Sequence, residues 1–130
     1  MSSSITTEVV RFLVEGDSAP LDVRNKAVEH VIDGIGLILA GSRTECVRKL
    51  VDFVLEKKND GSSTLLGFNS RAHASDAALV NGTGGHVDDY DDTQLSLSSD
   101  RIYGLLTHPT TPVLAAALAI GERVCCSAGD

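Results

Sequence analysis

The chain has 130 residues, of which 42% are hydrophobic and 22% charged, a balance typical of one soluble globular domain spanning residues 1–130. Its net charge of −7 disfavours a general nucleic-acid binder, which needs a basic face. No apolar run reaches the ~18 residues of a membrane span, and the first residues do not resemble a signal peptide. We therefore expect a cytoplasmic protein that binds neither nucleic acid nor membrane.

The first two predicted helices are rich in apolar residues. The first covers about residues 5–15, before Gly16. From Val23 to Ala40, apolar residues recur at helical spacing over a wide face, so we expect this second helix to be largely buried. Gly34 and Gly36 inside it each cost about 1 kcal/mol relative to alanine. That cost indicates that another backbone packs closely against both glycines.

The third predicted helix is the most clearly amphipathic. Thr44 is its expected N-cap, and apolar residues from Cys46 to Leu55 form one stripe. The helix should end at the turn-forming residues 59–61. The next segment, residues 62–72, lacks helical periodicity, and we expect at most one short extended piece near residues 64–68.

A fourth helix is predicted from Ser75 or Asp76 through Thr93, in the stretch "SDAALVNGTGGHVDDYDDT". On such a helix Gly85, Asp89 and Thr93 would share one face, and His86 would lie one turn before Asp89. The glycines would then leave room for a small ligand. Aspartates packed this closely raise one another's pKa, which suits proton transfer near neutral pH.

Residues 94–109 have the composition of a long serine-containing loop that ends at His108 and Pro109. A residue before proline favours extended backbone, which makes His108 a second candidate for chemistry. Thr111 and Pro112 should begin the last helix. That helix is small and apolar on nearly every side, so it requires partners all around. Together the segments predict an all-α, bundle-like fold that continues into something larger.

Two motifs compete for the aspartate-rich stretch. "DDYDD", residues 88–92, fits the D-D-x-x-D motif of helical prenyltransferases and terpene cyclases, which bind Mg²⁺ through carboxylates. The motif is short, and those enzymes line their pockets with aromatic side chains. This chain has only 3 Phe and 2 Tyr. The prenyltransferase hypothesis is therefore the weaker one.

The longer pattern resembles the MmgE/PrpD family. Members carry A-A-x-x-N-G, then H-x-x-D-[FY]-D-D-T, then H-P-[ST], then a helix of small residues that ends in A-x-[GA]-E. All of these motifs occur here in order: Ala77-Ala78, Asn81-Gly82, His86 through Thr93, His108-Pro109-Thr110 and Ala119 to Glu122. The resemblance implies the N-terminal portion of an all-helical domain, without the α/β lid domain of longer members. It further implies homodimers.

The resemblance also implies an activity. The family includes 2-methylcitrate dehydratase, cis-aconitate decarboxylase and an epimerase, which are lyases and isomerases acting on small di- and tricarboxylates without a cofactor or metal. By this resemblance Asp89 and His108 transfer or orient the proton. Thr93 would hydrogen-bond a substrate carboxylate, and His86 would support these residues from behind.

The chain departs from the family pattern in two respects. The segment between Thr93 and His108 is longer than expected, and the role of residues 94–107 stays open. The chain is also several times shorter than family members, whose sites use cationic and aromatic groups farther downstream. We therefore expect a truncated or split lyase that is inactive alone and works with a second copy or a longer paralogous chain. The alternative is a non-catalytic helical module that only pairs with such a paralogue.

Overall fold

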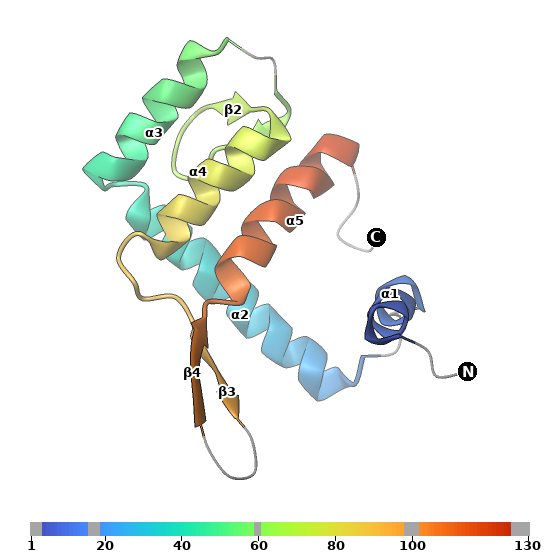
Figure 1. The fold of residues 1–130 in the computed structure, drawn as a ribbon. Coiled ribbons are helices and arrows are strands. Elements are labelled where there is room, and N and C mark those ends of the chain that lie inside the picture. Colours follow the sequence, from blue (N-terminus) through green and yellow to red (C-terminus); the bar gives the residue numbers. More distant parts are fainter. Residues whose placement is uncertain (1–3, 16–18, 59–60, 98–101, 126–130) are drawn as a thin grey trace.

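The computed structural model describes residues 4–15, 19–58, 61–97 and 102–125 (Figure 1). These residues form α1 (Ile5–Glu15), α2 (Leu21–Gly41), α3 (Glu45–Glu56), α4 (Ala74–His86) and α5 (Thr110–Val124). Two small antiparallel ladders accompany the helices: β1 (Ser63–Thr64) with β2 (Arg71–Ala72), and β3 (Gln94–Leu97) with β4 (Ile102–Thr107). Helices build the fold, as predicted. No described helix has the length and apolarity needed to cross a membrane.

The stripe predicted on α3 forms one side of the hydrophobic core. Thr44 caps the helix, because its hydroxyl accepts a hydrogen bond from the Val47 N–H at 3.4 Å. The core joins α3 to the β1–β2 segment, α4 and α5 through small and β-branched side chains. Its buried members are Val47, Val51, Val54, Leu65, Ala72, Ala74, Ala77, Val80 and Ala119.

Helices α2, α4 and α5 approach one another through glycines. A Cβ on Gly41 of α2 would lie 1.9 Å from the carbonyl oxygen of Gly84 in α4, and one on Gly34 would lie 2.6 Å from Leu114 Cδ2 of α5. Gly34 is therefore closely packed, but against the side chains of Leu114 and Thr110 rather than against the backbone that was predicted. The same prediction for Gly36 is wrong, because a Cβ there would meet nothing within 4 Å.

The structure corrects the expected burial of α2. Only Gly34, Ile38 and Gly41 are buried along this helix, because α4 and α5 cover just one of its sides. Large apolar residues such as Val28 and Ile32 are exposed. Helix α1, at the far end of α2 from α3 in Figure 1, has no buried residue at all.

The fourth predicted helix also ends earlier than expected. Helix α4 ends at His86, and Asp89 adopts a left-handed conformation with φ of 57°. Aspartate tolerates this conformation better than most residues and competes for backbone hydrogen bonds, which favours a turn over continued helix. The prediction that Gly85, Asp89 and Thr93 share one helical face is therefore wrong.

The segment predicted to be a long loop forms the β3–β4 hairpin. Gln94 pairs with Thr107 and Leu97 with Ile102, with an irregularity between Leu95 and Ser96. The apolar and polar residues of "QLSL" alternate as in a strand, a signal that the loop prediction overlooked. The hairpin projects away from the helices and returns the chain to His108 at the start of α5 (Figure 1).

Candidate active site

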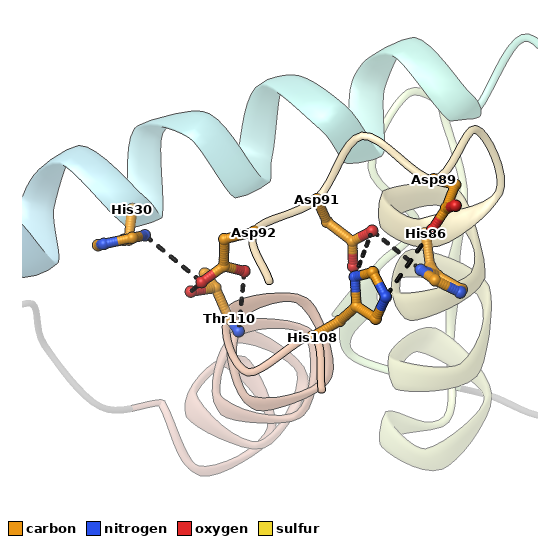
Figure 2. A network of polar contacts seen from close by, with 7 residues as sticks. All are labelled: His30, His86, Asp89, Asp91, Asp92, His108 and Thr110. Atoms are coloured by element: carbon orange, nitrogen blue, oxygen red, sulfur yellow. Dashed lines mark hydrogen bonds and ion pairs between the residues drawn. The ribbon is translucent and has the colours of Figure 1, made fainter. Parts of the chain in front are cut away.

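The site lies where the connection from α4 to β3 meets the residues before α5. His86 is the last residue of α4, and the left-handed turn at Asp89 reverses the chain behind it. The hairpin then brings His108 back against this connection (Figure 2). His86, the turn at Asp89 and His108 are therefore neighbours in space (Figure 2).

Asp91 is the centre of this arrangement. Its side chain is only 1% exposed, and His86 Nδ1 lies 2.9 Å from its Oδ1. His108 Nδ1 lies 3.2 Å from the same oxygen. The two imidazole rings meet edge to face, with centroids 4.6 Å apart. One buried carboxylate thus contacts both histidines (Figure 2).

These contacts shift the pKa values of the pair. The hydrogen bond that His86 donates to Asp91, reinforced by the charge of that carboxylate, raises the pKa of His86 above the ordinary 6.5. Burial acts to raise the pKa of Asp91, but the hydrogen bond and charge of His86 outweigh burial and lower it below 3.8. The Thr111 hydroxyl beside Asp91 also lowers the pKa of this carboxylate, although neither Thr111 Oγ1 nor Asp91 Oδ2 completes a hydrogen bond. Asp91 is accordingly a charged, buried acceptor at neutral pH.

Asp89 lies on the solvent side of the histidines. Its side chain is 79% exposed, and its Oδ1 is 3.8 Å from His108 Nε2. His108 therefore lies between two carboxylates, one buried at Nδ1 and one exposed at Nε2. An exposed carboxylate next to a free ring nitrogen is accessible to a ligand.

A cavity of about 490 Å³ opens beside the histidines. His86, Asp91 and His108 form its polar end, while Leu79 of α4 and Pro112 of α5 contribute to its apolar wall. Such a cavity, largely apolar with a few convergent polar groups, suits a small organic ligand. Gly82 also lines it, whereas a Cβ on Gly85 would lie 2.6 Å from Thr111 Cγ2, so Gly85 serves helix packing rather than ligand access.

Asp92 points to the opposite side of the connection and has a structural contact. Its carboxylate accepts hydrogen bonds from the Thr110 N–H at 3.2 Å and the Thr110 hydroxyl at 2.7 Å. It thereby stabilises the start of α5, whose first helical residue is Thr110, two residues before the predicted Pro112. His30 of α2 lies 3.6 Å from the same carboxylate. Asp88 is exposed, so the aspartates of the D-D-x-x-D motif do not converge on one point.

The structure brings together three of the four site residues predicted from the sequence. His86, Asp89 and His108 form one cluster, whereas Thr93 is exposed and does not line the described part of the cavity. Asp91 was missed, because nothing in the local periodicity distinguishes it from its neighbours. The H-x-x-D-[FY]-D-D-T motif contains Asp91 and was the one available signal.

The same cluster offers donors for a metal ion. One nitrogen or oxygen atom from each of His86, Asp89, Asp91 and His108 lies within 4.8 Å of the other three. Two imidazoles and two carboxylates are a donor set that suits Zn²⁺ or another borderline divalent ion better than Mg²⁺. The absence of a metal from this protein's function, expected from the sequence, therefore stays a prediction.

Comparison with known proteins gives one match. The family model for the MmgE/PrpD N-terminal domain matches residues 9–130. The matched range contains α2 to α5 and every residue of the cluster. No curated protein and no solved structure matches the chain.

Proposed function

Because this chain belongs to the MmgE/PrpD family, we propose that it contributes to a lyase or isomerase that acts on a small di- or tricarboxylate. The reaction is dehydration, decarboxylation or epimerisation by proton transfer, without a cofactor. The observation that carries the proposal is the pairing of His108 Nε2 with Asp89 Oδ1, 3.8 Å apart. His108 also lines the cavity, so a ligand bound there would lie next to its ring.

In the proposed step, His108 Nε2 removes a proton from the carbon next to a substrate carboxylate. The C–H bond breaks, its proton passes to Nε2, and its electron pair moves towards the carboxylate as an enolate-like anion. In a dehydration this pair then expels a hydroxyl group from the next carbon, which leaves as water after taking up a proton. Asp89 stabilises the imidazolium formed on His108 through its opposite charge.

Two further residues complete the proposed site. His86 has its pKa raised by Asp91, which favours its charged form, and its positive charge attracts an anionic substrate. The exposed hydroxyl of Thr93 has no partner among the described contacts and is free to donate to a substrate carboxylate. Thr93 follows Asp92 directly, so it lies on the connection that carries the cluster.

Hydrogen exchange at carbon tests this proposal. The chain, alone and mixed with a longer paralogous chain, would be incubated in D₂O with 2-methylcitrate, cis-aconitate or a related acid. Proton NMR would follow loss of the C–H signal next to a carboxylate. Asp89→Asn and His108→Ala should lower the exchange rate at least about 10²-fold, whereas Asp88→Asn should leave it unchanged. Undiminished exchange by His108→Ala would refute the assignment.

We also propose that a second copy or a longer paralogous chain covers the exposed apolar residues of α1 and α2. Ile5, Leu13 and Val14 of α1 are 72–81% exposed, and Ile32 of α2 is 66% exposed. Monomeric proteins rarely leave large contiguous apolar surfaces in water. Light scattering after size exclusion should show a dimer or a mixed complex, and a stable monomer under all conditions would contradict this.

The same apolar surfaces support a second candidate function, a non-catalytic module that only binds a partner. The two functions differ in the exchange experiment. A chain that associates but never exchanges a substrate proton, alone or in the mixed complex, is such a module. Exchange that depends on His108 identifies an enzyme.

A further inference from the structure

The buried Asp91 carboxylate has no part in the proton transfer proposed above, yet both histidines direct the same ring nitrogen towards it. Nδ1 of His86 and Nδ1 of His108 lie 2.9 Å and 3.2 Å from Asp91 Oδ1. We propose that Asp91 is a positioning residue that holds His108 in the tautomer protonated at Nδ1, which leaves the lone pair on Nε2. The effect of this tautomer on catalysis rests on the proposed function, whereas the assignment of the tautomer itself is independent of it.

The chemistry of the atoms dictates this tautomer. His108 Nδ1 is buried, and no hydrogen bond of ideal geometry is completed there. An ionised carboxylate oxygen can only accept, so a lone pair on Nδ1 would repel it, whereas a proton on Nδ1 is attracted to it. A neutral imidazole carries one N–H, so Nε2 must then be the acceptor. Nε2 faces Asp89 (Figure 2), but that carboxylate is farther away, at 3.8 Å, and 79% exposed, so solvent screens it and the closer, buried Asp91 decides the tautomer.

The division of work between the histidines follows from charge and exposure. Asp91 is 1% exposed, and a carboxylate this deeply buried needs a counter-charge or several donors. His86 is 53% exposed, so it can carry a positive charge while water solvates its outer edge. Because His86 meets the ionic requirement of Asp91, His108 needs only to donate a hydrogen bond. It can then accept a proton at Nε2.

This arrangement explains why two adjacent aspartates are not interchangeable. Asp91 turns towards the cavity and contacts imidazoles, whereas Asp92 turns away and caps α5. Asparagine at position 91 would present an N–H₂ group that can donate to His108 Nδ1. That donation would favour the opposite tautomer, with the proton on Nε2, where it blocks the base.

Long-range ¹H–¹⁵N NMR of the histidine side chains tests the tautomer directly. At about pH 9, where histidine is ordinarily neutral, wild-type His108 should show a protonated Nδ1 and a lone pair on Nε2. Asp91→Asn should shift the proton to Nε2, while Asp88→Asn should keep the wild-type pattern. A proton on Nε2 in the wild type would overturn the proposal without reference to any variant, so a folding defect in Asp91→Asn cannot obscure the result.

The exchange assay supplies the second readout. Asp91→Asn should lower kcat by about 10²–10⁴-fold, the contribution of a positioned general base, with little change in KM. A variant with the altered tautomer and a normal kcat would overturn the positioning role. If the wild type has the expected tautomer but never exchanges a substrate proton, the proposed function fails and the tautomer assignment stands.

Discussion

Neighbouring residues in the connection after α4 have different roles because their side chains leave it in different directions. Asp91 is buried against two histidines, Asp92 accepts hydrogen bonds from Thr110, and Asp89 stays exposed at the rim. Composition alone makes these carboxylates equivalent. Their surroundings decide which one shifts the pKa of a neighbour, which one stabilises a helix and which one is free to meet a ligand.

At the residue scale, the His86–Asp91 pair should make stability depend on pH. A histidine whose pKa is raised by folding stabilises fully below its ordinary value of 6.5 and loses that effect as pH rises through the raised value. The melting temperature of the wild type should therefore exceed that of His86→Gln most at about pH 5.5 and converge with it by about pH 9. Because His86 is half exposed, the two proteins should differ in their free energy of unfolding by no more than about 1 kcal/mol.

Asp91 sets the acid limit of this effect. Its lowered pKa means that its stabilising contribution is present above the ordinary 3.8 and disappears as pH falls through the lowered value. Differential scanning calorimetry of the wild type and His86→Gln, from acid pH to about pH 9, would measure the difference in melting temperature. A melting-temperature difference that grows towards alkaline pH would contradict the assigned pair.

A second prediction at the residue scale concerns the cap of α5. Asp92→Ala removes the acceptor of the Thr110 N–H and hydroxyl, so it should lower the free energy of unfolding by about 1 kcal/mol. Asp88→Ala changes an exposed aspartate of the same connection and should cost much less. Urea unfolding monitored by circular dichroism gives both values. Equal effects of the two substitutions would argue against the cap.

At the element scale, small residues determine how closely the helices of this fold cross. Gly41 of α2 and Gly84 of α4 allow one backbone to touch the other, and Gly85 accommodates Thr111 of α5. This contact places the end of α4 beside the start of α5. His86 and His108, next to those two ends, are brought together as a result.

A matched pair of alanine substitutions in α2 tests this packing. In Gly41→Ala the new Cβ would lie 1.9 Å from a backbone oxygen, so the substitution should cost at least about 1–3 kcal/mol of stability. In Gly36→Ala the Cβ would meet nothing within 4 Å, so better helix propensity should add about 0.5–1 kcal/mol. Thermal unfolding of the two variants and the wild type would decide. Similar destabilisation by both would show that the glycines act through something other than the helix contact.

At the scale of the whole molecule, the site is assembled from segments that only the complete fold brings together. Helix α4 supplies His86, the connection supplies both carboxylates, and the hairpin delivers His108. Helix α1, which has no buried residue, lies at the other end of α2 from α3 in Figure 1.

The arrangement of the aspartates predicts the response to magnesium. Asp88, Asp89 and Asp92 do not converge, so Mg²⁺ should leave the melting temperature unchanged up to millimolar concentration. A saturable rise would restore the prenyltransferase hypothesis, since an ion that binds only the folded state must stabilise it. Zn²⁺, which the two histidines would prefer to Mg²⁺, is the more demanding test. A saturable rise with Zn²⁺ that is lost in His108→Ala would contradict the metal-free site.

The sequence by itself determined the family, the helical class and the stripe of α3 with its Thr44 cap, and it singled out His86, Asp89 and His108, which lie together in the structure. These features depend on local periodicity, local capping or motif order, all of which can be observed along the chain. Only the tertiary structure decided that α4 stops at His86, that Gln94–Leu97 pairs with Ile102–Thr107, and that the buried Asp91 contacts both histidines. Burial of a single carboxylate depends on where distant segments return, and no periodicity within the aspartate-rich stretch contains that information.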